Sequence, residues 1–181
     1  EFAKTLPGIT APLGFFDPLG FCASEGSSNE QVSEGKVLFY REVEIKHGRV
    51  AMLAALGFPL AEQFHPLFGT DDAPSFSAFQ QTPLQTFWPV VVAVIAIPEV
   101  FSVFSFENPA SRDEAGNPAQ PWTIKKTHSP GDLGFDPLNL KPTNPTELKE
   151  MQTKELNNGR LAMIAIAGMI VQEGVTGTKL F

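Results

Sequence analysis

The sequence Glu155-Leu-Asn-Asn158-Gly159-Arg160-Leu-Ala-Met163 contains a carboxylate, an amide and a guanidinium, and it leads into an apolar run over residues 161–171. An apolar run of this length, opened by charged groups, predicts a helix that is buried or lies in a membrane. The same pattern, E-x-x-(H/N)-G-R-x-A-M, begins at Glu44, where His47 replaces the amide, and it leads into the apolar run 50–61. The chain therefore carries the same polar entrance to an apolar helix twice.

A second repeated motif precedes each of these helices. The sequence Leu13-Gly-Phe-Phe-Asp17-Pro18-Leu19 comes before the first copy, and Leu133-Gly-Phe-Asp136-Pro137-Leu138 comes before the second. One further apolar segment, residues 87–106, lies between the two units. Internal duplication at this scale indicates two similar structural units in one chain.

The composition points to a small membrane protein. The chain has 181 residues, enough for one domain, and its formal net charge of −7 argues against a nucleic acid partner. Cys22 is the only cysteine, which excludes a disulfide framework and a cysteine-based metal site. The mean hydropathy is close to zero because strongly apolar segments alternate with polar loops rich in proline. The chain begins with Glu1 rather than methionine, so we expect a processed form.

The apolar segments predict a single all-α membrane domain over residues 1–181, with three transmembrane helices at about residues 34–64, 83–106 and 145–173. Residues 87–106 carry one charge, Glu99, and about 20 residues suffice to cross about 30 Å of hydrocarbon. Thr143 and Asn144 are placed to cap the third helix, because Pro145 suits a first helical turn. With three spans the first and third helices are parallel and crossed, so an approximate two-fold axis along the membrane normal relates the repeats.

The repeated motif places its donors on one side of a helix and its arginine on another. Residues three apart share a helix face, so Glu44 lies beside His47, and Glu155 lies beside Asn158. The arginine follows the glutamate by five residues, about 140° further round at about 100° per residue. That is poor geometry for an ion pair within one helix.

Two such helices can cross at Gly48 and Gly159, because residues without side chains allow two backbones to approach closely. Each arginine then meets the glutamate of the other helix, which predicts two ion pairs, Glu44–Arg160 and Glu155–Arg49. These pairs would cancel charges that otherwise cost about 2.5–3.5 kcal/mol each in a bilayer. A simpler interpretation is that they are structural ion pairs and nothing more.

Further single donors lie along the predicted helices. Glu99 is in the middle helix with no lysine or arginine near it in sequence, and Gln172 is near the end of the third helix. A membrane redox enzyme would need several ligands that converge on one metal, and the sequence contains neither H-x-x-x-H nor an E-x-x-H pair repeated on partner helices. Carboxylate, imidazole and amide groups spread singly over three helices instead favour many separate cofactors, each with one axial ligand.

These motifs, in this order, resemble the chlorophyll-binding light-harvesting antenna family, three-helix proteins of thylakoid membranes, over essentially the whole chain. The short loops and the L-G-F-F-D-P-L-G-F arm are most similar to the branch that binds chlorophyll a and c with fucoxanthin or peridinin. The resemblance implies that Arg49 and Arg160 compensate glutamate charges. It also implies that six side chains each serve as the axial ligand of one chlorophyll magnesium, namely Glu44, His47, Glu99, Glu155, Asn158 and Gln172.

The resemblance further implies that the two L-G-F-D-P-L loops hold the ends of two carotenoids of the fucoxanthin, peridinin or diadinoxanthin type. The aspartates would support these loops by accepting backbone N–H bonds, and the residues concerned are Asp17, Pro18, Asp136 and Pro137. The sequence departs from the family pattern at two positions. Ala61 is the repeat equivalent of Gln172, so a ligand there would have to be Glu62 or Gln63, or be absent. Val91 stands where many relatives have a second middle-helix ligand.

The function that the resemblance implies is light harvesting rather than catalysis. The protein would hold chlorophyll a, chlorophyll c and carotenoids as a multi-pass protein of the plastid thylakoid membrane. It would pass excitation energy to a photosystem core, with photosystem I slightly favoured, beside other antenna subunits and thylakoid lipids. An alternative within the same family is a photoprotective quencher, which acidic lumenal residues would favour, and Asp71 and Asp72 are the clustered acids in that loop.

Overall fold

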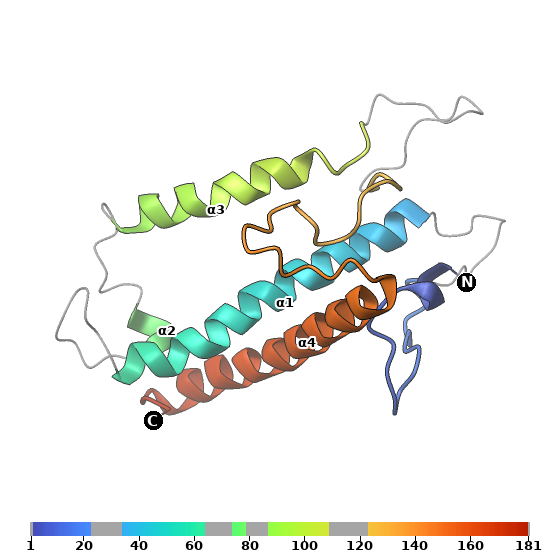
Figure 1. Ribbon diagram of the computed structural model, residues 1–181. Coiled ribbons are helices and arrows are strands. Elements are labelled where there is room, and N and C mark those ends of the chain that lie inside the picture. The colour runs from blue at the N-terminus through green and yellow to red at the C-terminus, as the bar shows by residue number, and fades with distance from the viewer. Residues whose placement is uncertain (1, 23–33, 64–73, 79–86, 109–122, 181) are drawn as a thin grey trace. The chain divides into compact units, whose positions relative to one another are not determined.

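The computed structural model describes residues 2–22, 34–63, 74–78, 87–108 and 123–180. Within these ranges the chain forms helices and connecting segments, with two isolated bridges and no strand. The long helices are α1 (Glu34–Gln63), α3 (Phe87–Val103) and α4 (Pro145–Thr176), and the short ones are η1 (Phe2–Thr5) and α2 (Ser75–Ala78) (Figure 1). The prediction of an all-helical chain with three main helices is confirmed.

The short helices lie where the sequence predicts none. Both η1 and α2 have four residues, and they fall in segments that we expected to be extended or loop. A helix of about one turn carries no apolar periodicity. The sequence pattern therefore could not indicate either of them.

The two ends of α4 show which sequence signals decide its boundaries. Asn144 caps the start as expected, because its side-chain oxygen accepts the N–H of Thr146 at 3.1 Å. The expected end at residue 173 is wrong, because Gly174 continues the helix and Gly177, with a φ of 64°, follows its last residue. The Gly177 N–H donates to the Glu173 carbonyl at 2.8 Å, which closes the last turn.

Helix α3 ends earlier than expected. After Val103 the N–H groups of residues 104–106 donate to carbonyls three residues back, at 3.1–3.2 Å, and Phe106 then pairs with Ile124. Residues 83–86 and residue 64, which we also expected to be helical, lie outside the described residues. None of the helices in the described ranges is both long enough and apolar enough to cross a membrane. The membrane-spanning part of the fold prediction stays a prediction.

The chain divides into two compact units, one of residues 1–46 and 99–156 and the other of residues 47–98 and 157–181. In the second unit, α1 and α4 meet at Gly48 and Gly159, where a Cβ atom added to either glycine would lie 2.9–3.0 Å from the Cα of the other. The predicted close approach of the two helices at these glycines is confirmed. Ala51 and Ala162, three residues further on, are buried as well.

In the first unit, the segment that begins at residue 123 is fastened to α1 and to the end of α3. Ile124 is fully buried, and its N–H donates to the Gly35 carbonyl at 3.1 Å. The Lys125 N–H donates to the Ser105 carbonyl at 2.9 Å. Buried apolar side chains of α1 complete this core, namely Val37 and Leu38.

Candidate functional site

The repeat is visible in the exposure of side chains in the second unit. His47 and Asn158, two of the predicted ligands, are both exposed. Each precedes a buried glycine at the helix contact, so both donors lie outside that contact. The chain therefore presents one nitrogen or oxygen donor to its surroundings at two equivalent positions.

Large apolar side chains accompany these two donors along each helix. Val50 and Leu161, three residues after His47 and Asn158, are 67 % and 68 % exposed. Leu53 and Ile164, three residues further on, are 75 % and 73 % exposed. Soluble monomers rarely expose apolar surface that is continuous over more than a few hundred Å². A flat apolar cofactor with one open axial position fits a donor in such surroundings.

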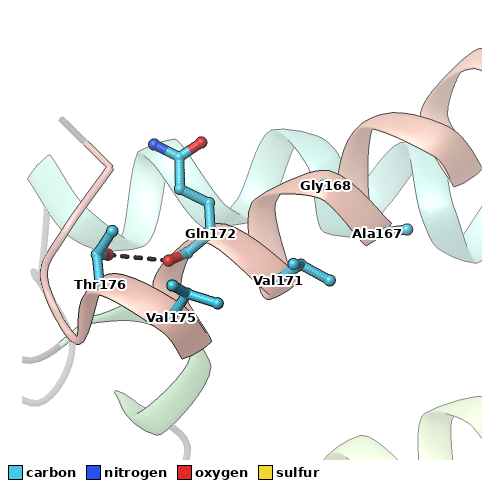
Figure 2. A pocket seen from close by; sticks show the side chains of 6 residues that line it. All are labelled: Ala167, Gly168, Val171, Gln172, Val175 and Thr176. Atoms are coloured by element: carbon cyan, nitrogen blue, oxygen red, sulfur yellow. Dashed lines mark hydrogen bonds between the residues drawn. The ribbon is translucent and has the colours of Figure 1, made fainter.

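Gln172, a third predicted ligand, lies in a shallow apolar hollow of about 560 Å³ on the C-terminal half of α4 (Figure 2). Its amide extends away from the helix, while its main-chain carbonyl accepts the Thr176 hydroxyl at 2.9 Å. Gly168 lies one turn earlier, and a Cβ atom there would meet nothing within 4 Å. An apolar floor with one outward amide suits a macrocycle that needs a single axial oxygen. The lining residues are Ala167, Gly168, Val171, Gln172, Val175 and Thr176.

The sequence prediction missed a matched pair of buried carboxylates in the second unit. Glu62 in α1 and Glu173 in α4 are 5 % and 3 % exposed, and each follows its motif glutamate by 18 residues. The Glu62 carboxylate accepts the Leu180 N–H at 3.0 Å, so it holds the segment after α4. Glu62 is also one of the two alternatives to a ligand at the repeat equivalent of Gln172, and the structure shows its carboxylate buried and bonded to the Leu180 N–H. The equal spacing from the two motifs was the signal that could have found this pair.

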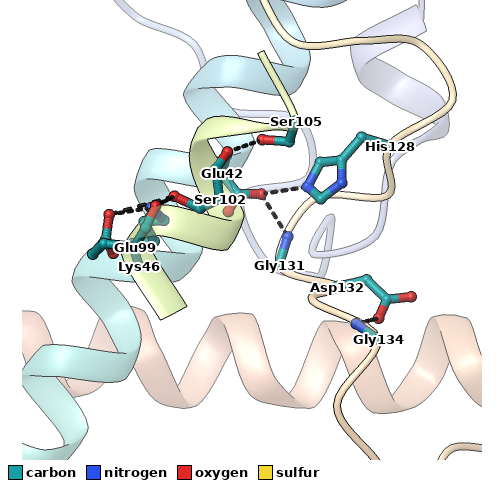
Figure 3. Close-up of polar contacts among 9 residues, drawn as sticks. All are labelled: Glu42, Lys46, Glu99, Ser102, Ser105, His128, Gly131, Asp132 and Gly134. Atoms are coloured by element: carbon teal, nitrogen blue, oxygen red, sulfur yellow. Dashed lines mark hydrogen bonds and ion pairs between the residues drawn. The ribbon is translucent and has the colours of Figure 1, made fainter. Parts of the chain in front are cut away.

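In the first unit, Glu99 lies on the surface of α3 and is paired with a lysine (Figure 3). Lys46 Nζ is 2.8 Å from Glu99 Oε2 and 2.8 Å from the hydroxyl oxygen of Ser102. No lysine or arginine lies near Glu99 in sequence, so this cation comes from a distant part of the chain. The two residues are 53 positions apart in the chain, and only folding brings them together.

The motif glutamates Glu44 and Glu155 are half-buried, and so are the two motif arginines. Arg41 Nη1 donates to Glu44 at 2.9 Å, a contact within α1 that the motif did not suggest. In the second unit Arg160 donates to the Asn157 side chain at 3.2 Å. The predicted pairs would join the two units and stay predictions, namely Glu44–Arg160 and Glu155–Arg49.

The two L-G-F-D-P-L loops, both in the first unit, share one hydrogen-bonded structure. Asp17 accepts the N–H groups four and five residues on at 3.0 and 2.8 Å. Asp136 accepts the N–H groups four and five residues on at 3.0 and 2.9 Å. The prediction that both aspartates accept backbone N–H bonds is confirmed.

Each loop also turns at the same place. Pro18 and Pro137 follow the aspartates, and the residues three after the aspartates, Gly20 and Asn139, have positive φ values of 69° and 51°. Glycine and asparagine adopt this left-handed conformation more readily than other residues do. The turns leave large apolar side chains 67–85 % exposed, namely Phe16, Leu19, Phe135 and Leu138.

A buried glutamate, Glu42, fastens the second loop to α1 (Figure 3). Glu42 is 3 % exposed, and its Oε2 accepts the Gly131 N–H at 2.6 Å and lies 3.3 Å from His128 Nε2. The arm that leads into the first loop is held to α4 in a similar way, because Gly8 donates its N–H to the Thr153 hydroxyl at 3.1 Å. Each loop is therefore held by the helix of the other repeat.

These two fastenings occupy equivalent positions in the repeat. Glu42 and Thr153 each lie two residues before the motif glutamate. Their glycine donors each follow a proline and have positive φ values of 95° at Gly8 and 78° at Gly131. The sequence prediction missed these contacts because one acceptor is a carboxylate and the other a hydroxyl, so the two positions do not form a recognisable motif. The repeated Pro-Gly pair was a usable signal.

Local contacts shift the acid–base properties of the loops. A hydrogen bond from the Lys141 side chain, and then the Gly134 N–H, lower the pKa of Asp132. Backbone N–H groups of the following residues lower the pKa of Asp136. In the first loop, burial raises the pKa of the Cys22 thiol. At neutral pH the two aspartates are therefore ionised, and Cys22 is a protonated thiol of low reactivity.

Across the part of the chain that the structure describes, no three His, Cys, Asp or Glu side chains come together to hold a metal ion. The donors are single and separate, and they stand among exposed apolar side chains. The family model for chlorophyll A-B binding protein matches residues 2–174 of the chain. The chain belongs to the chlorophyll a-b binding protein family.

Relatives in this family come from several organisms. Light-harvesting complex stress-related protein 1 of Chlamydomonas reinhardtii is 47 % identical, over 99 % of this chain and 68 % of its own. The fucoxanthin-chlorophyll a-c binding protein of Isochrysis galbana is 42 % identical, over 98 % of this chain and 80 % of its own. Both are named as chloroplastic proteins. A fucoxanthin-chlorophyll a-c binding protein of Chattonella marina is 36 % identical over 97 % of this chain and 71 % of its own.

Membership of the chlorophyll a-b binding family confirms the resemblance inferred from the repeated motifs. The protein is a light-harvesting, chlorophyll-binding protein, and its family binds pigments rather than acting as enzymes. The family as a whole implies carotenoid pigments and association with photosystems.

Proposed function

We propose that the protein is an antenna subunit that binds chlorophyll a, chlorophyll c and a xanthophyll in the thylakoid membrane. The observation that carries the proposal is the matched exposure of His47 and Asn158, each beside a buried glycine and among exposed apolar side chains. The bound pigments supply light absorption and the transfer of excitation energy. The chain supplies their spacing, their orientation and the apolar surroundings that set their energies.

Six side chains are proposed as axial ligands of chlorophyll magnesium. The macrocycle already provides four nitrogens and balances the metal charge, so one further nitrogen or oxygen donor suffices. His47, Asn158 and Gln172 are neutral and exposed, which suits this role directly. Glu44, Glu99 and Glu155 carry a charge, which is unfavourable under an apolar pigment unless a cation compensates it. The ligand role of the glutamates therefore predicts a cation beside each.

For Glu44 and Glu155 we propose the cross-helix partners Arg160 and Arg49. The close approach of the helices at Gly48 and Gly159 supports this pairing, because the arginine directly follows the glycine in both copies of the motif. The half-burial of all four charged side chains also supports it. Arginine suits such pairs because it stays protonated and binds a carboxylate through two N–H groups.

The L-G-F-D-P-L loops are proposed to hold the end groups of two carotenoids. Each loop is shaped by two carboxylate hydrogen bonds and by a turn residue with positive φ, so its conformation is well defined. Each loop also exposes large apolar side chains, which Phe16 and Phe135 exemplify at 67 % and 85 % exposure. A defined apolar platform suits the ring at the end of a long apolar polyene.

The multi-pass membrane location is supported by α3. Four of its apolar residues lie almost consecutively and are 55–62 % exposed, namely Val92, Val94, Ile95 and Ile97. Neighbours in a helix point in directions about 100° apart, so the exposed apolar surface of α3 runs round the helix. Lipid chains, pigments and other antenna or photosystem subunits are the surroundings that suit such a helix.

The central test is to replace the two matched neutral donors. His47→Leu and Asn158→Leu, each reconstituted with chlorophylls and a xanthophyll, should each lose about one chlorophyll, because one axial ligand holds one magnesium. Each should also lose a component of the red absorption band. Lys154→Leu, a change at an exposed residue of α4, is the control and should keep the full pigment content.

The outcomes of this test separate two claims. Full pigment content and an unchanged spectrum in both leucine variants would show that these residues are not ligands. A colourless, folded protein isolated from native membranes would contradict the antenna function itself. Pigment extraction and chromatography of the same material identify the chlorophylls and the xanthophyll.

A second candidate function is photoprotective quenching. The observation that favours it is the 47 % identity to a relative named as stress-related. The acids that we connected with this role, Asp71 and Asp72, lie outside the described residues. A quencher should shorten the chlorophyll fluorescence lifetime of the purified protein when the pH falls from neutral to mildly acidic, and a light harvester should keep the same lifetime.

A further inference from the structure

Two contacts hold the ammonium group of Lys46 against α3 (Figure 3). Lys46 Nζ lies 2.8 Å from Glu99 Oε2 and 2.8 Å from Ser102 Oγ. The Ser102 hydroxyl is itself oriented, because it donates to the Glu99 main-chain carbonyl at 2.9 Å and Ser102 is 3 % exposed. Ordering a lysine side chain costs rotamer entropy. Two acceptors at hydrogen-bonding distance therefore indicate a defined position for this ammonium group.

The sequence of α3 explains why the cation comes from another helix. α3 contains no lysine or arginine. A cation three positions after a glutamate could pair with it on the same helix face, and this position holds Ser102. The counter-charge of Glu99 is instead supplied by α1, from the residue directly before His47.

We propose that Lys46 is the charge-compensating and positioning residue of a chlorophyll site at Glu99. The proposal rests on the proposed function, in which Glu99 is an axial ligand. Lys46 contacts the carboxylate through Oε2, and the Glu99 side chain is 55 % exposed, so a macrocycle can reach the carboxylate from outside. Glu99 would hold the pigment, and in a site shielded from water the adjacent ammonium group of Lys46 would balance the charge of the carboxylate.

This role differs from a purely structural one in a measurable way. If Lys46 compensates a ligand charge, chlorophyll binding requires Lys46 only while residue 99 is charged. If Lys46 only joins α1 to α3, the loss of Lys46 has the same effect whether residue 99 is charged or neutral. A neutral amide at position 99 can still offer an oxygen to magnesium, so Glu99→Gln is the variant that separates the two roles.

The test uses the full chain reconstituted with chlorophylls and a xanthophyll. Lys46→Met should lose about one chlorophyll, because the one pigment held by Glu99 is no longer compensated. Lys46→Arg and Glu99→Gln should keep it, and the double variant Lys46→Met with Glu99→Gln should keep it as well. The matched control is Lys126→Met, which removes an exposed lysine paired with Glu34 at 3.1 Å and should leave the pigment content unchanged.

A second readout needs no pigment. In the pigment-free chain in detergent, acetylation of amines followed by mass spectrometry should modify Lys46 more slowly than Lys126. The Lys46 side chain is 31 % exposed and paired, and that of Lys126 is 72 % exposed. Glu99→Gln should speed the reaction at Lys46 and leave it unchanged at Lys126.

Each result decides between the possible roles. Loss of one chlorophyll in the double variant as well as in Lys46→Met would show a structural role and overturn the proposal. Full pigment content in Lys46→Met, where Glu99→Leu lacks one chlorophyll, would also overturn it. Full pigment content in Glu99→Leu would remove Glu99 from the ligands and this proposal with it, while the assignments of His47 and Asn158 and the antenna function would stand.

Discussion

At the scale of single residues, the contact between Gly48 and Gly159 leaves no room for a side chain. A Cβ atom at Gly48 would lie 3.0 Å from the Gly159 Cα. The atoms that it meets are backbone, which cannot turn away as a side chain can. Gly48→Ala should therefore lower the free energy of unfolding by about 1–3 kcal/mol. Thermal unfolding of the reconstituted protein, followed by circular dichroism, measures the change.

Gly57 provides the matched control for this prediction. It lies in the same helix and the same unit, and a Cβ atom there would meet nothing within 4 Å. Gly57→Ala should be neutral or should stabilise the protein by about 0.5–1 kcal/mol, because alanine loses less backbone entropy on folding. Equal destabilisation by both alanines would contradict the close contact at Gly48.

At the scale of elements, the segment that leads into each L-G-F-D-P-L loop is held by a hydrogen bond to one side chain on the helix of the other repeat. Glu42→Ala should expose the Gly131 N–H to exchange with solvent, and Thr153→Val should do the same for Gly8. Hydrogen bonds to a charged group contribute about 1.5–3 kcal/mol and those to a neutral group about 0.5–1.5 kcal/mol. Glu42→Ala should therefore have the larger effect. Hydrogen–deuterium exchange of the two loops, read by mass spectrometry, measures both.

The loop whose hydrogen bond is left intact provides the control for each variant. Glu42→Ala should leave exchange in the first loop unchanged, and Thr153→Val should leave the second loop unchanged. Glu150→Ala, at an exposed position of α4, should alter neither. General loosening of both loops by either variant would mean that the effect comes from helix stability rather than from the two hydrogen bonds.

The second loop should also resist acid. Hydrogen bonds hold the pKa values of Asp132 and Asp136 below their usual range. The ionised carboxylates therefore stabilise the loop above the usual aspartate pKa of about 3.9, and this contribution disappears as the pH falls through the lower folded values. Amide protection at Leu140 and Lys141, corrected for intrinsic exchange, should persist from neutral pH to about pH 4. Loss of protection near pH 6 would contradict this assignment.

At the scale of the whole molecule, the sequence repeat carried most of the information. The three long helices, the glycine contact and the aspartate loops could all be predicted, because each depends on residue spacing within one segment or on a motif that occurs twice. The start of α4 could be predicted from Asn144, since a helix cap is a local feature. The resemblance to antenna proteins followed from the same motifs, and it was confirmed over residues 2–174.

The features that the sequence did not reveal depend on contacts between distant segments. Lys46 and Glu99 lie on different helices, and neither residue has a motif that marks the other. The contact between Glu42 and Gly131 uses a backbone N–H, and the Pro-Gly pair that marks this glycine does not identify the side chain that accepts from it. The burial of Glu62 depends on the segment after α4, which folds back to it. In each case the tertiary fold determines the partner.

The fastening of Gly8 to Thr153 has a consequence for the order in which the molecule is completed. The two residues are 145 positions apart, and a ribosome makes the chain from its N-terminus. The arm around Gly8 is therefore synthesised early but cannot form this bond until α4 exists, and closing so long a loop carries an entropic cost. Docking of the arm through this bond therefore requires that α4 has been made.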